Sequence, residues 1–347
     1  MRNSKSRYSQ MMIALFVAII GIILIQNYNF VNQSFAASVL SLIIGIIILI
    51  ICMIPSLIVK RKTNLSFIGF VSRETPTVMI FLSMFYALYF VYVIVNFLLR
   101  YSSVFTTTGN RSDAGFFVIF AILAVCVFSS VKGIGAVARC SLFVFAFAVA
   151  ALALFFGGNI GNLDFSYLEF DFNTSQLQFG SAVFAMPAFA AVVFGFFEYN
   201  SSIRVKNLIW LLCGIAAVLL IVVFFVYFVL GDYGTMQSYQ IFLLSKTAEF
   251  GNVGGIDSFY LSLCAMAVFV PVSLCLICVG RVVNRDEDVW CMIIFAAISY
   301  VLYLTADYYN SVREIILNPY VFDFFTLLAS FVLPIIYITI LRRRIDA

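Results

Sequence analysis

The sequence predicts an all-α integral membrane protein of ten transmembrane helices, built as two inverted repeats of five, with the first and sixth helices broken. Three observations carry this prediction. The 347-residue chain is 64% hydrophobic and 10% charged, whereas soluble domains carry about 25% charged residues. Apolar runs of the roughly 17–25 residues needed to cross a bilayer recur along the chain. Basic residues gather in alternate connections between these runs.

Ten apolar runs have the length of a membrane crossing. They cover about residues 10–29, 35–59, 77–99, 114–131, 135–156, 179–199, 207–230, 257–280, 288–306 and 319–341. The first run is long, and no small-residue cleavage site follows it, so we expect a retained helix rather than a signal peptide. The ten runs form a single transmembrane domain over residues 1–347, with one repeat over about 8–156 and the other over about 179–341.

The basic residues predict the orientation. With the N-terminus in the cytoplasm, the outer segments hold only Arg100, Arg111, Lys246 and Arg313, which leaves 16 of the 20 basic residues inside. This is a strong positive-inside bias. It places both termini in the cytoplasm, and it accounts for the net charge of +4 without a nucleic-acid partner.

Several kinds of chemistry are excluded by the residues present. The chain has no histidine, which removes most general-base and imidazole-metal schemes. Cys275 and Cys278 form a C-x-x-C pair in the middle of an apolar run, where a redox or zinc role lacks polar surroundings and further ligands. We expect buried thiols there. No catalytic residue, metal site or cofactor is predicted, and the chain is not expected to be an enzyme.

The sixth run, FGSAVFAMPAFAAVVFGFFEYN, contains Pro187 near its middle. Proline inside a helix removes a backbone donor and costs about 3 kcal/mol or more. Ten helices divide into two halves of opposite topology, and such repeats place a binding site where broken helices meet near the midplane. The sixth helix opens the second half. A break is therefore predicted over Ala185, Met186, Pro187, Ala188 and Phe189.

The corresponding first run has Gly21 near its middle. Glycine loosens a helix and lets another group approach the backbone. Two unwound helices would offer N–H groups to a carboxylate and carbonyl groups to an ammonium, which suits a zwitterionic amino acid. Glycine and proline also occur in membrane helices that are only kinked, and that alternative stays open.

The third run places Tyr89, Tyr92 and Asn96 on one helical face. A polar stripe in a lipid-bathed helix should turn toward a partner or a cavity, although ordinary packing is the competing explanation. The candidate ligand site combines this face with both predicted breaks and with a proline in the eighth run. Its residues are Gly21, Ile22, Ile23, Tyr89, Tyr92, Ala185, Met186, Pro187, Ala188, Phe189 and Pro271.

Several positions match a known family in order and spacing. They are Gln10 with Gly21, Arg100 at the outer end of the third run, Gly133 to Arg139 in KGIGAVARC, the acidic loop LDFSYLEFDF, and Pro334 before a basic tail. In these features the chain resembles the spore germination permeases, the GerAB-type B subunits of germinant receptors, in the amino acid–polyamine–organocation superfamily. It departs from that family at Ile23, Tyr28, Ala190, Ala191, Gly254 and Gly255.

The resemblance implies a LeuT-like, APC-type fold and a ligand-sensing role in the spore inner membrane. It implies a small nutrient ligand, an amino acid, bound at mid-membrane. It also implies two partners, an A-type membrane subunit and a C-type lipoprotein. An amino-acid transporter of the same superfamily is the alternative function, and a subunit retained only for assembly is a third.

Overall fold

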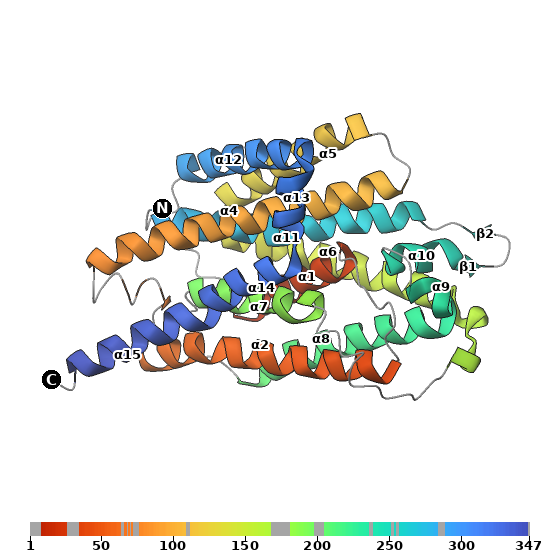
Figure 1. The fold of residues 1–347 in the computed structure, drawn as a ribbon, viewed down its shortest axis with the longest axis horizontal. Coiled ribbons are helices and arrows are strands. Elements are labelled where there is room, and N and C mark those ends of the chain that lie inside the picture. The colour runs from red at the N-terminus through yellow and green to blue at the C-terminus, as the bar shows by residue number, and fades with distance from the viewer. Residues whose placement is uncertain are drawn as a thin grey trace.

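The computed structural model describes residues 8–25, 35–63, 66–67, 69, 71, 76–108, 112–167, 181–197, 205–235, 239–250, 253–254, 257–283 and 289–345. Each of the ten expected apolar runs overlaps a long helical segment (Figure 1). These segments are α1 (Tyr8–Ile25), α2 (Phe35–Thr63), α4 (Pro76–Thr107), α5 (Ser112–Val131), α6 (Ile134–Gly157), α7 (Ser181–Phe196), α8 (Val205–Phe225), α11 (Asp257–Val283), α12 (Val289–Tyr308), and α14 (Pro319–Leu327) with α15 (Leu333–Ile345).

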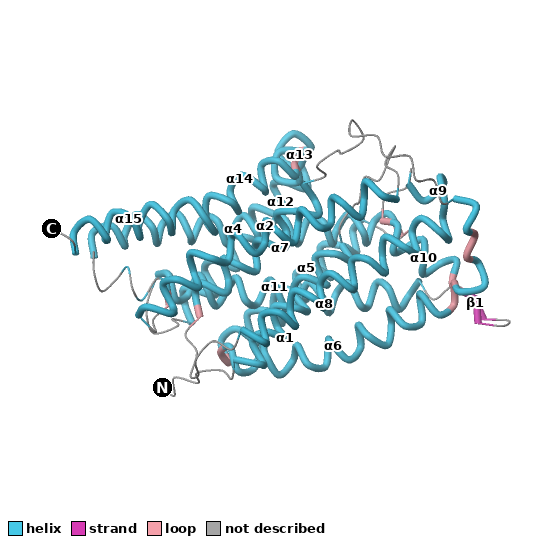
Figure 2. The backbone as a smooth tube through the Cα atoms, turned by 90° about the horizontal axis from the view of Figure 1, so that it is seen from below, coloured by secondary structure: helices cyan, strands magenta, loops and turns pink. Residues whose placement is uncertain are grey.

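Two π-helical segments continue these helices. One, η4 (Val226–Leu230), follows α8, and the other, η5 (Leu328–Val332), joins α14 to α15. The short elements are η1 (Ile160–Asn162), η2 (Phe165–Tyr167), α9 (Gly231–Thr235), α10 (Gln240–Thr247), α13 (Asn310–Leu317) and the antiparallel pair β1 (Glu249–Phe250) and β2 (Val253–Gly254). In Figures 1 and 2, α9, α10 and β1 lie at one end of the bundle, and α15 ends at the other.

Within the part of the chain that the structure describes, seven helices are long and apolar enough to cross a membrane. They cover Phe35–Val59, Val78–Thr107, Ile134–Asn162, Asn207–Leu230, Phe259–Val283, Val289–Tyr308 and Pro319–Thr339. Two further apolar stretches, Gln10–Ile25 and Gly115–Val131, are shorter. The chain is therefore a multi-pass helical membrane protein, as predicted, while the exact number of ten crossings stays a prediction.

The helix α11 forms the core of the bundle. Within its spanning window 83% of the residues are buried, against 28–44% for the other six spans. It packs against α1, α4, α5, α6 and α12. The outer helices instead expose large apolar side chains such as Phe117, Phe143 and Trp290. In a membrane protein, such faces contact lipid.

The contacts between helices repeat in the two halves of the chain. The packing of α1 on α6 has a counterpart in that of α7 on α14, and α2 on α7 corresponds to α8 on α1. Likewise α5 on α11 corresponds to α12 on α4. Each of these three contacts recurs when both helices are exchanged for those five spans away. This agrees with the internal repeat that the sequence predicts, although the repeat boundaries themselves stay a prediction.

The turn between α5 and α6 depends on one glycine. Gly133 has φ 83° and ψ 173°, a positive-φ conformation that is essentially confined to glycine and costs other residues on the order of 1–3 kcal/mol. Its backbone N–H donates to the carbonyl of Ser130 at 2.9 Å. This is the glycine of the KGIGAVARC stretch, so at this position the resemblance coincides with a backbone requirement.

The prediction that the first and sixth helices are broken is wrong for the backbone of α1 and α7. The helix α1 runs without interruption through Gly21, and α7 runs without interruption through Ala185 to Phe189, with Pro187 inside it. The helix α11 likewise continues through Pro271. Membrane helices tolerate these residues when neighbouring groups satisfy the freed backbone, and the carbonyl that Pro271 frees packs closely against Gly21 of α1.

Candidate functional site

The predicted site residues come from four helices that meet. The helix α11 packs against α1, α4 and α7, α1 packs against α4 and α7, and aromatic rings connect α4 with α7. At this junction the side chains of Ile22, Ile23, Tyr89 and Phe189 are buried, as is Pro271. Tyr92 is partly buried. The side chains of Ala185, Met186, Pro187 and Ala188 lie outside the described set, so their place in the site stays a prediction.

The helices α1 and α11 approach each other closely at Gly21. A Cβ atom added at Gly21 would lie 2.5 Å from the carbonyl oxygen of Ala267 and 2.9 Å from its carbonyl carbon. This carbonyl has no helical donor, because the residue four positions later is Pro271, which lacks an N–H. Gly21 therefore provides the space in which the freed carbonyl meets the backbone of α1. The glycine and the proline of the sequence pattern serve one helix–helix contact.

Aromatic rings join α7 to α4 beside this contact. The ring of Phe196 lies edge-to-face with Tyr86 at 4.9 Å and with Phe90 at 5.0 Å between centroids. Phe189 meets Phe97 in the same way at 5.6 Å. These geometries each contribute about 0.5–1.5 kcal/mol beyond simple burial. At these positions the junction is filled by protein side chains.

The polar stripe of α4 turns inward, as predicted, and its partners are protein groups. Tyr89 Oη donates to Thr326 Oγ1 at 3.2 Å. Tyr92 Oη and Asn96 Nδ2 both donate to the carbonyl of Ile316, at 3.1 and 2.6 Å. The stripe therefore binds the segment that runs from α13 into α14. Of the two explanations that the sequence left open, this geometry favours packing for Tyr89 and Tyr92.

The stripe continues in both directions beyond the predicted residues. Tyr86 Oη donates to the carbonyl of Ala329 in η5 at 2.8 Å. Arg100 donates through Nε to Asn96 Oδ1 at 2.7 Å and through Nη2 to the carbonyl of Leu317 at 3.4 Å. The sequence signal was available, since Tyr86 and Arg100 extend the same face at helical spacing. Among the described residues, Arg100 is the one charged side chain that is buried.

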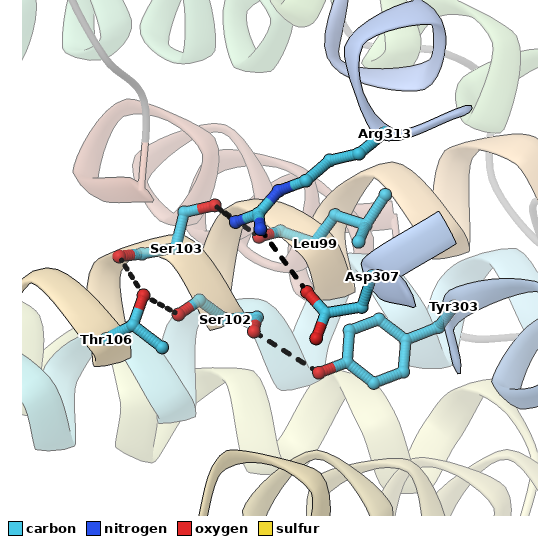
Figure 3. A network of polar contacts seen from close by, with 7 residues as sticks. All are labelled: Leu99, Ser102, Ser103, Thr106, Tyr303, Asp307 and Arg313. Carbon is cyan, nitrogen blue, oxygen red and sulfur yellow. Dashed lines mark hydrogen bonds and ion pairs between the residues drawn. The ribbon is translucent and has the colours of Figure 1, made fainter. Parts of the chain in front are cut away.

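A second polar network closes the same end of α4 (Figure 3). Arg313 of α13 donates to Ser103 Oγ at 2.7 Å and lies 3.5 Å from a carboxylate oxygen of Asp307 in α12. Tyr303 of α12 donates to Ser102 Oγ at 3.2 Å. The network ties α4, α12 and α13 together. Beside it opens a pocket of about 480 Å³, lined by Asn310, Arg313, Glu314, Leu317, Asn318 and Pro319.

The short helix α10 is held over the junction by Asn159, a fully buried residue after α6. Asn159 Nδ2 donates to the carbonyls of Phe155 and Leu244, at 2.6 and 2.8 Å, and its Oδ1 accepts from Thr247 Oγ1 at 2.9 Å. Nothing in the sequence pattern singles out this residue. Its buried amide becomes apparent only once α6 and α10 are placed together.

Two tyrosines connect α10 to the helices below it. Tyr260 of α11 lies 5.5 Å from the ring of Phe242 and donates to the carbonyl of Leu24 in α1 at 2.6 Å. Tyr239, before α10, is hydrogen-bonded to Ser103, and burial raises its pKa, a shift that this bond and the nearby Arg100 and Arg313 oppose. The helix α10 thus covers the end of the contact between α1 and α11 at Tyr260.

The two cysteines of the C-x-x-C pair, Cys275 and Cys278, are buried thiols outside any disulfide, as predicted. Within the described ranges no group of three or more His, Cys, Asp or Glu residues could hold a metal ion. What the junction offers a ligand is backbone carbonyls, hydroxyl groups and shape.

Comparison with known proteins identifies the fold. No family model matches the chain, and no curated protein matches it. A solved structure, the substrate-bound outward-open state of a Na⁺-coupled sialic acid symporter with a novel Na⁺ site, matches with a TM-score of 0.60 at 12% identity. The match covers 94% of this chain and 79% of the symporter. At this identity it shows the fold alone, which is the LeuT-type membrane transporter fold that the sequence predicted.

Proposed function

We propose that this chain binds a small nutrient, an amino acid, inside the membrane and reports the binding to partner subunits, as the B subunit of a spore germinant receptor. The coarser part of this statement, a multi-pass membrane protein with a transporter fold, follows from the structural match. The receptor role rests on the resemblance of the sequence. The same resemblance implies a location in the spore inner membrane and two partners, an A-type membrane subunit and a C-type lipoprotein.

One structural observation supports sensing: the core of a transporter fold is tied together by hydrogen bonds between helices. Tyr89, Asn96 and Tyr260 each bind a group on another helix. Such bonds contribute about 0.6 kcal/mol on average in membranes. A ligand shifts a conformational equilibrium only by its difference in affinity for the two states. Because these bonds are weak, the binding energy of a small ligand is sufficient to break the contact between α4 and α14.

The residues predicted on α1 remain part of the proposed site. Ile22 and Ile23 are buried on the helix that packs against α11, and the carbonyl of the neighbouring Leu24 accepts a bond from Tyr260 of α11. The carbonyl of Ala267, which Pro271 leaves without a helical donor, lies against Gly21 and is the backbone group here that suits an ammonium. These residues keep their role in the proposal without a helix break.

The alternative function is amino-acid transport, and the similarity to a Na⁺-coupled symporter favours it. The two functions differ in flux. The purified chain, reconstituted alone in vesicles, is tested for binding and uptake of labelled amino acids, with and without a sodium gradient. Phe143→Leu, a change on an exposed face, provides the control.

A receptor subunit should bind at least one amino acid and show no uptake above that of protein-free vesicles. Saturable uptake by the chain alone would establish the transporter and exclude sensing as the primary role. Absence of both binding and uptake would contradict both functions and leave the assembly role. Germination of spores that carry the chain with and without its A and C partners completes the comparison.

A further inference from the structure

The helix α13 lies where the chain leaves and re-enters the membrane. The span before it ends at Tyr308, and the span after it begins at Pro319. The ten intervening residues cannot extend far from the membrane surface at which both spans end. Figure 1 shows α13 lying across the direction of the long helices, and Figure 2 shows it at the edge of the bundle beside α14.

One side of α13 is fixed to the protein. Its last two carbonyls, those of Ile316 and Leu317, accept bonds from Asn96 and Arg100 of α4. Arg313 is bound to Ser103 and Asp307. These contacts use the polar groups that could otherwise bind an anionic headgroup, and they fix which side of the helix faces outward.

The other side exposes large apolar and aromatic groups. Ile315 is 62% exposed, and the tyrosines that flank the helix, Tyr308, Tyr309 and Tyr320, are 81%, 59% and 72% exposed. The two spans that α13 connects also expose large apolar side chains, which include Val301 and Leu302 of α12 and Phe324 of α14. The apolar side of α13 therefore lies between two helices that themselves expose apolar groups.

Tyrosine is enriched at the boundary between lipid and water because its ring is apolar and its hydroxyl is polar. Helices that lie in this layer bury an apolar side among the headgroups and keep charged groups toward water. Exposed Asn310 and Glu314 on α13 meet the second requirement. We propose that α13 is an interfacial anchor whose Tyr308, Tyr309, Ile315 and Tyr320 contact the headgroup layer of the bilayer.

The contact requires no particular lipid charge. The exposed charge of α13 is acidic, since Glu314 faces outward while Arg313 is engaged by Asp307. Zwitterionic vesicles should therefore be sufficient. Because the inner side of α13 holds Asn96 and Arg100, the anchor sets the depth at which the α4 stripe sits in the membrane.

The test uses tryptophan as a probe of depth. The two natural tryptophans, Trp210 and Trp290, are replaced by phenylalanine in the full chain. Single probes are then introduced as Tyr308→Trp, Ile315→Trp and Tyr320→Trp. Glu249→Trp, at an exposed position in β1, serves as the water-facing control, and Leu302→Trp serves as the lipid-facing control. Each variant is reconstituted in phosphatidylcholine vesicles that carry bromine at a shallow or a deep acyl position, and iodide is the aqueous quencher.

The three α13 probes should be quenched several-fold more by shallow bromine than the Glu249→Trp probe. Their iodide quenching should be correspondingly weaker than that of the control. The proposal is overturned if iodide quenches Ile315→Trp as strongly as Glu249→Trp, which would place the helix in water. It is equally overturned if neither quencher reaches the probe, because a second copy of the chain would then cover this face.

Discussion

Asn96 connects Arg100 of the polar stripe to the end of α13 through one amide. It donates to the carbonyl of Ile316 and accepts from Arg100, and its side chain is fully buried. Removing one partner of a buried hydrogen bond leaves the other unsatisfied, which costs about 1–3 kcal/mol. The amide therefore holds both the guanidinium and the end of α13 in place.

Replacing Asn96 with leucine should lower the free energy of unfolding by about 1–3 kcal/mol. The guanidinium of Arg100 loses an acceptor at 2.7 Å, and the carbonyl of Ile316 loses one of its two side-chain donors, Asn96, and keeps Tyr92. The measurement is unfolding of the purified chain in mixed micelles. Ser83→Ala, which removes an exposed bond within one helix, should change stability by less than about 0.5 kcal/mol. Equal stability of the two variants would contradict the role assigned to Asn96.

Gly21 makes a sharper test because a single methyl group decides the outcome. In Gly21→Ala the new Cβ would lie 2.5 Å from the oxygen of Ala267, so α1 and α11 must separate. We expect a loss of about 1–3 kcal/mol and a smaller response to nutrient per molecule. Gly161→Ala is the matched control, since nothing lies within 4 Å of its Cβ position. If Gly21→Ala is stable and fully responsive, the close approach of α1 and α11 is not required for stability or for the response.

The sequence could predict that Gly21, Pro187 and Pro271 matter, but not how. A glycine in a membrane helix gives the same signal whether the helix unwinds or a neighbour packs against it. Only the placement of Ala267 beside Gly21 distinguishes the two. The inward face of Tyr89, Tyr92 and Asn96 was predictable from spacing alone. The identity of their partners was not, because it requires α14 to be placed against α4.

Among the elements, α10 depends most on one residue outside it. Asn159 satisfies two carbonyls and one hydroxyl at the contact between α6 and α10. The buried face of α10, which includes Ile241, Phe242 and Leu244, then stays in place. The exposed Asn162 adds a single bond to the carbonyl of Thr247 at 3.2 Å. The buried amide should therefore control the opening of this helix.

In Asn159→Leu, backbone amides of α10 should exchange with solvent about 10-fold faster, which corresponds to about 1.4 kcal/mol of local stability. The leucine cannot satisfy the carbonyl of Leu244, so opening becomes less costly. Hydrogen exchange followed by mass spectrometry over residues 240–247 provides the measurement. Asn162→Ala should leave exchange nearly unchanged. The same exchange in both variants would show that burial alone holds α10.

At the scale of the whole molecule, the membrane class and most helix positions were predictable from apolar length. The orientation is a separate prediction that rests on the basic residues. Contacts now add that the regions of Asp164 and Lys246 lie at one end, since Asn162 binds the carbonyl of Thr247. The structural match extends over nearly the whole chain. It does not identify the ligand of this chain, because proteins at 12% identity share the path of the helices and few of the side chains.

Epitope tags at Asp164, Lys246 and Glu314 should be reachable from outside the cell, and tags at Lys62 and Lys132 should not. The expectation follows from the positive-inside bias. Antibody labelling of intact cells, compared with permeabilised cells, gives the result for each tag. A reversed result at two neighbouring loops would break both the orientation and the count of ten crossings.

The hydrogen bonds between α4 and the segment from α13 to η5 also determine when α4 can complete its contacts during synthesis. Tyr86 is separated from Ala329 by 243 positions, and Arg100 from Leu317 by 217. Ribosomes add about 5–20 residues per second, so α4 waits on the order of 10–50 s before its acceptors exist. During that interval the amide of Asn96 and the guanidinium of Arg100 must be hydrogen-bonded to water or to the insertion machinery. A nascent chain halted after α12 should therefore be recognised and degraded, even though most of its helices are already in the bilayer.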